Sequence, residues 1–203
     1  MATKTPTTTD ACRRPYRFTI KQLERMIETG VIPDSTDVEL VRGKLYRMTK
    51  YEPHNFTVAM MARRLGRMFP EEEFTVREEK SMSHDQRSMP EPDIAVVRGR
   101  LEDFRPRPPS TSEAVLLVEV CQSTKRADYH DKLSLYAEGG APTYWIVDLD
   151  ARTVTVHADP MSQGARSIYS RVEAFADDAS VPVVFDGREL GRIVVKDVLP
   201  PPS

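Results

Sequence analysis

The sequence predicts an α/β domain in which a mixed central β-sheet is flanked by α-helices. Three observations in consecutive segments point to this class. The continuous apolar run AVLLVEVC at residues 114–121 is typical of a strand that is buried on both faces. Residues 127–138 have a helical pattern that ends at a Gly-Gly pair and a proline, and the apolar segment YWIVDL follows at residues 144–149. A strand, a helix and a second strand in this order form a crossover unit within a sheet.

Further helices and strands are expected on both sides of this unit. Residues 18–30 and 54–69 have apolar side chains at helical spacing, and residues 37–48 alternate around Arg42-Gly43 as in a β-hairpin. Additional strands are expected at residues 73–78, 93–97 and 153–158, with short strands near 168–173 and 193–195. Since no internal repeat or linker interrupts the pattern, we expect one domain at residues 16–200, preceded by a flexible Thr- and Pro-rich tail at residues 1–15.

Composition places the protein among globular proteins. Of the 203 residues, 39% are hydrophobic and 30% are charged, and no apolar run approaches the roughly 20 residues of a membrane span. The N-terminus has no apolar stretch that resembles a signal peptide, so we expect a cytoplasmic protein without a membrane partner. The two cysteines, Cys12 and Cys121, form neither a disulfide framework nor a zinc-binding spacing. A formal net charge of −2 neither indicates nor excludes a nucleic-acid partner.

Glu119 is the one charged residue in the apolar run of residues 114–121. An ionised carboxylate in such a strand costs several kcal/mol unless a cation compensates it. Asp93 opens a second apolar segment, DIAVV, at residues 93–97. If the two strands are neighbours, the two carboxylates meet at one end of the sheet and raise the pKa of one of them unless a cation joins them. A divalent metal is the stronger candidate, because Mg²⁺ is bound through one or two carboxylates together with waters and substrate phosphates.

Lys132 is a second candidate partner for these carboxylates. It lies in the predicted helix of residues 127–138, where Asp128, Lys132, Leu135 and Tyr136 share one face. An inward Lys132 would direct its ammonium at the carboxylates and would orient water or stabilise charge in a transition state. In the alternative, Lys132 forms an exposed helical pair with Asp128, worth about 0.3–0.5 kcal/mol. Spacing alone favours this alternative.

Three further polar residues near these segments have open roles. His54 begins a predicted helix, where an imidazole commonly serves as a capping or packing group. Glu78 and Glu79 end a predicted strand that could approach the same site, but nothing in the sequence decides their direction. Since the chain has no glycine-rich phosphate loop, nucleotide hydrolysis of the P-loop type is not expected.

The segments EPDIAVVRGR and LLVEVCQSTKRADYHDKLSLYAEGGAPTYWIVDLDARTVTVH resemble the Uma-type family of restriction endonuclease-like proteins. This family belongs to the PD-(D/E)XK nuclease superfamily. YRFTIKQLERMIETG and DVELVRGKLYRM agree with it, so that the resemblance spans residues 16–157. It implies a restriction endonuclease-like core and a metal-dependent phosphodiesterase.

The resemblance also implies roles for individual residues. Asp93 matches the aspartate of the PD element and Glu119 the acidic residue of the next strand, which makes both metal ligands, with the Val120 carbonyl oxygen as an additional ligand. The superfamily pattern has a lysine two residues after the glutamate, where this chain has Cys121. In Uma-type relatives the lysine lies on the following helix, and Lys132 matches it.

Glu39, in DVELV, matches a further acidic residue of the family. The resemblance makes it a metal ligand or a water-holding group, and the alternative is an exposed or salt-bridged residue of the hairpin. The leading hypothesis is therefore a Mg²⁺-dependent (or Mn²⁺-dependent) endonuclease that hydrolyses DNA phosphodiester bonds, expected as a homodimer because nucleases that cut both strands often act symmetrically. The alternative hypothesis is a non-catalytic binding or assembly module that keeps the nuclease-like fold.

Overall fold

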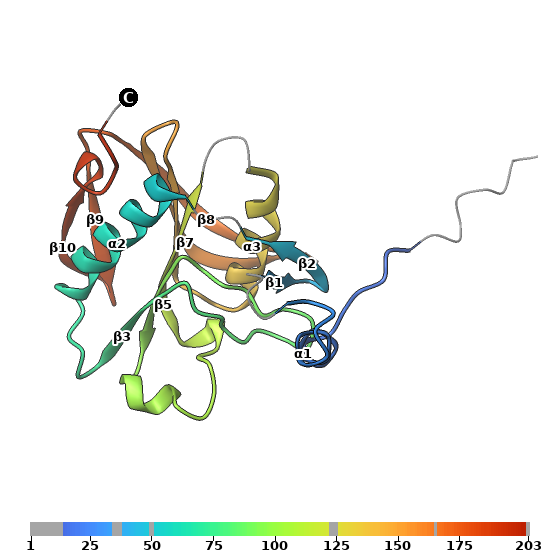
Figure 1. Cartoon of the computed structure of the whole chain (residues 1–203). Helices are drawn as coiled ribbons and strands as arrows, with labels where there is room; N and C mark the ends of the chain where they lie inside the picture. Colours follow the sequence, from blue (N-terminus) through green and yellow to red (C-terminus); the bar gives the residue numbers. More distant parts are fainter. Residues whose placement is uncertain (1–13, 34–37, 49–50, 122–125, 165, 202–203) are drawn as a thin grey trace, which may run out of the picture.

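The computed structural model has a central six-stranded β-sheet with one helix on each face (Figure 1). It describes residues 14–33, 38–48, 51–121, 126–164 and 166–201, with the side chains of residues 126–130 outside the described part. The helices are α1 (Ile20–Glu28), α2 (Glu52–Gly66) and α3 (Arg126–Glu138). The strands are β1 (Val38–Val41), β2 (Lys44–Arg47), β3 (Phe74–Glu78), β4 (Ile94–Arg98), β5 (Ala114–Cys121), β6 (Thr143–Asp148), β7 (Thr153–Gln163), β8 (Arg166–Ala176), β9 (Ser180–Phe185) and β10 (Arg188–Val194).

The central sheet is mixed, as the sequence predicted. Its strand order is β3-β4-β5-β6-β7-β8. Strands β5 and β6 are parallel, and the other neighbouring strands pair antiparallel. Helix α3 makes the crossover between β5 and β6, since two parallel strands cannot be joined by a tight turn. The expected strand–helix–strand unit is therefore confirmed.

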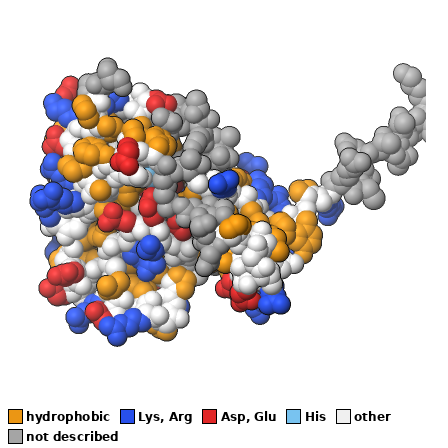
Figure 2. Space-filling view, viewed as in Figure 1, with side chains coloured by type: hydrophobic (Ala, Val, Ile, Leu, Met, Phe, Trp, Pro, Cys, Tyr) orange, Lys and Arg blue, Asp and Glu red, His pale blue; other side chains and the backbone are white. Residues whose placement is uncertain are grey.

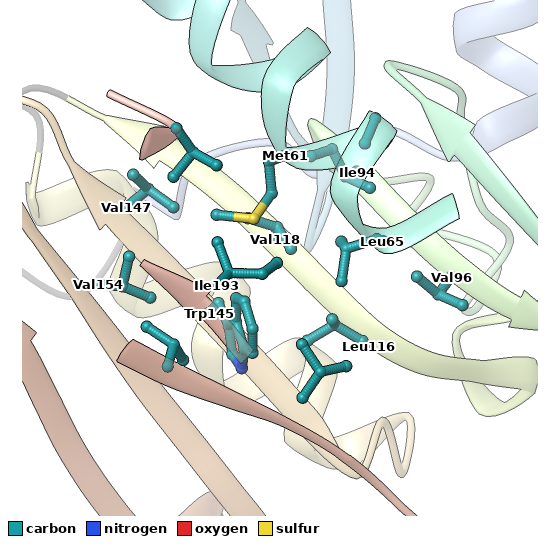
Figure 3. Close-up of a cluster of buried hydrophobic side chains, with 14 of the residues drawn as sticks. Met61, Leu65, Ile94, Val96, Leu116, Val118, Trp145, Val147, Val154 and Ile193 are labelled. Atoms are coloured by element: carbon teal, nitrogen blue, oxygen red, sulfur yellow. The ribbon is translucent and has the colours of Figure 1, made fainter. Parts of the chain in front are cut away.

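Side chains of the sheet alternate between two apolar layers. Val118 of β5 packs with Met61 and Leu65 of α2 and with Trp145 of β6 (Figure 3). Hairpin β9–β10 closes this layer and contributes Ile193. On the opposite face Leu117, Tyr144 and Tyr169 pack with Leu135 and Tyr136 of α3. Because successive residues of a strand point to opposite faces, β5 is buried along its whole length.

The hairpin β1–β2 lies on the α3 side, where Val41 joins the apolar layer. Its turn consists of Arg42 and Gly43, with φ of 49° and 76°. Two reasons favour glycine at position 43. Its φ is positive, and an added Cβ would lie 2.8 Å from Cβ of Arg17. Leu40 and Met89 exchange backbone hydrogen bonds of 3.4 and 2.7 Å, which hold β1 against the segment that leads into β4.

The C-terminal region departs from the sequence prediction. β7 and β8 each run over 11 residues, longer than expected, and β9 forms where no strand was predicted. β7 continues through Pro160, although proline has no N–H to donate. The pairing of β7 with β6 ends at Ala158, so β8 is the one strand paired with β7 at Pro160. In β10 the pairing shifts between Glu189 and Gly191, which interrupts the alternation that predicts strands.

Two expectations lie wholly or partly outside the described residues. The predicted tail of residues 1–15 is described only at residues 14 and 15, and the predicted helix cap at residues 123–124 is not described. The single domain at residues 16–200 therefore stays a prediction. None of the described helices is long and apolar enough to cross a membrane.

Candidate functional site

The strands that carry Asp93 and Glu119 are neighbours, which the metal hypothesis requires. Ile94 of β4 pairs with Val118 of β5, so Asp93 and Glu119 lie at the same end of the strand pair. The exposed fractions of the two residues are 4% and 2%. Oδ2 of Asp93 accepts a hydrogen bond of 2.6 Å from the backbone N–H of Val120. The two carboxyl groups therefore belong to one buried region.

The two carboxylates nevertheless contact different layers of the protein. Glu119 follows the alternation of β5 and reaches side chains of α3, whereas Oδ1 of Asp93 lies 3.1 Å from Nε2 of His54 in α2. We call residues Glu39, Glu119, Lys132 and Tyr136 the α3-side cluster. We call residues His54, Glu79 and Asp93 the α2-side cluster.

In the α3-side cluster, Lys132 binds two carboxylates at once. Its Nζ lies 2.9 Å from Oε1 of Glu119 and 2.9 Å from Oε2 of Glu39, and it also donates to the carbonyl oxygen of Glu91 at 3.4 Å. Tyr136 donates to Oε1 of Glu119 at 2.8 Å. Lys132 is only 6% exposed, so the expectation of an exposed Lys132 is wrong, and the side chain of Asp128 lies outside the described residues. The lysine of the helix does reach Glu119, although β5 itself has Cys121 at the usual lysine position.

Glu39 is buried and salt-bridged to Lys132, so of the alternative expected for it the exposed residue is wrong and the salt-bridged residue is what the structure shows. It lies on β1 and is 6% exposed. Its Oε2 also accepts a hydrogen bond of 3.1 Å from the N–H of Glu91. The contact between Leu40 and Met89 holds β1 in place, and this long-range pairing carries Glu39 over the end of β5.

Electrostatics explain why the lysine stays charged. Burial lowers the pKa of Lys132, but Glu119 and Glu39 raise it by more, so that it lies above its ordinary value. Burial raises the pKa of Glu119 to about 8, and Asp93 and Glu39 add to this while Lys132 opposes it. Two carboxyl groups thus contact one ammonium and Asp93 acts on it from farther away, so the region favours an additional cation.

The α2-side cluster joins three elements. His54 lies in the first turn of α2, Glu79 follows the end of β3 and Asp93 precedes β4. One possible ligand atom from each residue lies within 4.8 Å of the others. His54 is 6% exposed, and its Nδ1 has no hydrogen-bond partner among the described residues. Burial lowers the pKa of His54, but Asp93, together with Asn55 and Glu79, raises it by more, so that it lies above its ordinary value.

Glu79 reaches this cluster through an unusual backbone conformation. Its φ is +49°, a left-handed value that is uncommon for residues other than glycine, asparagine and aspartate. The N–H of Glu79 donates to the carbonyl oxygen of Asp93 at 3.0 Å and holds this conformation. Glu78, one residue earlier, is exposed. No sequence signal marks this turn, because the hydrogen bond joins residues from two strands.

The role of Val120 as a metal ligand stays a prediction. Its N–H binds Asp93, and its strand pairs in parallel with Val147 of β6. The backbone at Val120 therefore lies beside Asp93 and one residue from Glu119, which is where the resemblance places an additional ligand.

A mixed α/β sheet with carboxylates on two adjacent strands and a lysine beside them defines a nuclease-like protein. The chain belongs to the Uma2 family, described as "Putative restriction endonuclease", whose model matches residues 20–192. The sequence resemblance to the Uma-type family is thereby confirmed.

A solved structure has the same fold. The crystal structure of a "putative nuclease belonging to DUF820" from Anabaena variabilis ATCC 29413 is similar with a TM-score of 0.66 at 16% sequence identity, covering 89% of this chain and 97% of that chain. At this identity the likeness concerns the fold, and it confirms the expected restriction endonuclease-like core. No curated protein matches the chain.

Proposed function

We propose that the protein is a divalent-metal-dependent endonuclease that hydrolyses phosphodiester bonds of DNA. The observation that carries the proposal is the buried Lys132, whose Nζ lies 2.9 Å from both Glu39 and Glu119, one strand away from Asp93. Membership in a family described as restriction endonucleases supports DNA as the substrate.

The donor atoms of the region suit Mg²⁺ or Mn²⁺. Both ions prefer carboxylate and carbonyl oxygens, and the region has two carboxyl groups on one ammonium with Asp93 on the neighbouring strand. Asp93, Glu119 and the Val120 carbonyl would hold the ion, and Glu39 would support it from the hairpin β1–β2. When bound, the ion supplies Lewis-acid polarisation of the phosphate and lowers the pKa of a water.

The residues of the α3-side cluster position the reacting groups. Lys132 and Tyr136 both donate to Oε1 of Glu119, so among the described contacts Oε2 is left for the metal. With two carboxylates on its ammonium, Lys132 has one defined position, from which it orients the attacking water or balances charge on the phosphate. In the reaction the water oxygen bonds to phosphorus, the bond to the leaving sugar oxygen breaks, and that oxygen ends protonated.

A plasmid-cleavage assay with Mg²⁺ or Mn²⁺ tests this proposal. Asp93→Ala and Lys132→Ala should each reduce cleavage by roughly 100-fold or more, the loss typical of a removed electrostatic contact. Lys44→Ala is the matched control, because Lys44 pairs with the exposed Asp131 next to Lys132 on α3. Circular dichroism at the assay temperature shows whether each variant is folded. Equal cleavage by all four proteins would contradict the proposal.

One observation favours the non-catalytic module as a second candidate. The ammonium of Lys132 is already matched by two carboxylates, so the α3-side cluster is complete as a structural ion pair. In addition, acidic and basic side chains are interspersed on the face shown in Figure 2. Calorimetric titration with Mg²⁺ and Mn²⁺ distinguishes the candidates: a nuclease site gives a heat of binding that Asp93→Asn reduces, and a pure binding module gives none.

The homodimer and the cytoplasmic location stay predictions. A dimer would give two sites for the two strands of a duplex. Sedimentation velocity should then show twice the mass of the 23.1 kDa chain. A monomer at micromolar concentration, with full cleavage of both strands, would contradict the dimer.

A further inference from the structure

We propose that His54, Glu79 and Asp93 form a binding site for a first-row transition-metal ion such as Mn²⁺, on the α2 side of the sheet. The inference rests on the proposed function in one respect, because the two sites share Asp93. It goes further by naming the class of metal ion that binds there. It adds two ligands, a histidine and a glutamate, to which neither the family resemblance nor the sequence pattern assigns a metal.

The spacing of the three side chains suits coordination of one ion. Ligands at about 2.1 Å from an octahedral ion are about 3.0 Å apart when adjacent and about 4.2 Å apart when opposite. Nε2 of His54 and Oδ1 of Asp93 are 3.1 Å apart, the separation of two adjacent ligands. The possible ligand atom of Glu79 lies within 4.8 Å of both.

Each ligand is held by a separate part of the fold. The N–H of Val120 binds Oδ2 of Asp93 at 2.6 Å and leaves Oδ1 directed at His54. The hydrogen bond of Glu79 to Asp93 holds the backbone of Glu79 in the left-handed conformation, and such strained conformations commonly occur at functional sites. Ligands fixed in this way lose little conformational freedom when an ion binds.

His54 supplies its nitrogen ligand through Nε2, the ring atom that lies 3.1 Å from Oδ1 of Asp93. Its Nδ1 lacks a hydrogen-bond partner among the described residues, although His54 is only 6% exposed. The Asp93 side chain contacts His54 and the Val120 amide among the described residues, and neither is a lysine or an arginine.

The donor set decides the class of ion. Mg²⁺ prefers oxygen ligands, whereas imidazole suits the first-row transition metals, and carboxylates suit Mn²⁺ as well. One imidazole and two carboxylates therefore favour a transition-metal ion over Mg²⁺. Three protein ligands also leave coordination positions open for water or a phosphate oxygen, as at catalytic metal sites.

Pulsed electron paramagnetic resonance of the full chain with Mn²⁺ tests the nitrogen ligand. Wild type should show modulation from ¹⁴N bound directly to Mn²⁺, and His54→Gln should lose it. His84→Gln is the control and should keep the signal, because His84 hydrogen-bonds Thr111 instead. Bound Mn²⁺ without ¹⁴N modulation in wild type would overturn the site.

Calorimetry with Mn²⁺ tests the carboxylate ligand independently of His54. Glu79→Gln should weaken Mn²⁺ binding by at least about tenfold, whereas the exposed neighbour Glu78→Gln should stay within about twofold of wild type. Equal affinities of the two variants would overturn the site. If the wild type cleaves DNA but shows no ¹⁴N modulation, only the His54 site is contradicted. If Mn²⁺ shows ¹⁴N modulation but the wild type does not cleave DNA, only the nuclease proposal is contradicted.

Discussion

The two polar clusters balance their buried carboxylates in different ways. In the α3-side cluster the chain supplies the cation itself, because Lys132 contacts both Glu39 and Glu119. In the α2-side cluster the basic group is an imidazole, and its contact is with Asp93. Both clusters lie at the same end of the β4–β5 strand pair, and each contacts a different helix.

The difference concerns what each cluster needs in order to be stable. A buried carboxylate costs several kcal/mol unless it is paired and hydrogen-bonded, and a permanent ammonium meets this need without any ligand. An imidazole can lose its proton and expose a nitrogen lone pair to a metal. The α3-side cluster therefore suits a fixed positioning role, and the α2-side cluster suits an exchangeable ion.

The largest effect is expected from Lys132→Met. This variant leaves Glu39 and Glu119 buried without their cation, and the free energy of unfolding at pH 9, above the pKa of about 8 of Glu119, should fall by about 3–5 kcal/mol. Lys44→Met is the control, because the pair of Lys44 with Asp131 is exposed and worth less than about 1 kcal/mol. Urea denaturation measures both. Similar losses in the two variants would contradict the buried, charge-balancing role of Lys132.

Tyr136→Phe should have the next largest effect. The hydroxyl donates to the Glu119 carboxylate at 2.8 Å, and hydrogen bonds to charged groups contribute about 1.5–3 kcal/mol. Tyr169→Phe is the matched control, since its hydroxyl is also buried but donates to the neutral carbonyl of Ala141 at 3.0 Å, worth about 0.5–1.5 kcal/mol. Thermal denaturation at pH 9, where Glu119 with its pKa of about 8 is ionised, should rank Tyr136→Phe as the less stable. The opposite ranking would show that Glu119 is not ionised in the folded protein.

His54→Gln should cost less than either change in the α3-side cluster. In the presence of a chelator we expect about 1 kcal/mol, because Asp93 keeps its hydrogen bond to the Val120 amide when the imidazole is lost. The measurement is again urea denaturation. A loss as large as that of Lys132→Met would mean that His54 is the built-in cation of its cluster, and the contrast between the clusters would disappear.

The smallest effect concerns pH and the exposed pair of Asp131 and Lys44. The hydrogen bond from Lys44 holds the pKa of Asp131 below its ordinary value of 3.8. A folded pKa below the unfolded one adds stability above the unfolded pKa, and this stability is lost as the pH falls through the folded pKa. The difference between wild type and Lys44→Met should therefore be present at pH 6, vanish in strong acid and shrink in 1 M NaCl, because salt screens exposed pairs. A difference that persists in strong acid would contradict this origin.

Much of the fold follows from local patterns in the sequence. The run AVLLVEVC predicts β5 with its observed ends, and the helical pattern before Gly139 predicts α3. β9 was not predicted, and β10 was predicted only as a short strand near residues 193–195. Gly191 interrupts the alternation of β10, and an added Cβ there would lie 3.0 Å from Met68, so this position depends on a contact with a distant segment.

Some residues of the candidate site could also be predicted from the sequence, and others could be placed only by the structure. Asp93, Glu119 and Lys132 could be named from the sequence, because charged residues in or facing apolar segments require a partner. Glu79 and His54 could not be placed, since the turn at Glu79 depends on a hydrogen bond to Asp93 and the direction of His54 depends on how α2 packs.

The sequence by itself determined the strand–helix–strand core and the need of Glu119 for a cation, because apolar runs and charges within them have energetic consequences whatever the rest of the chain does. Only the tertiary structure decided which cation each carboxylate meets. Strand alternation turns Glu119 toward Lys132, whereas hydrogen bonds between β3, β4 and β5 turn Glu79 and Asp93 toward His54. Such contacts form between residues far apart in the chain, and no local pattern encodes their direction.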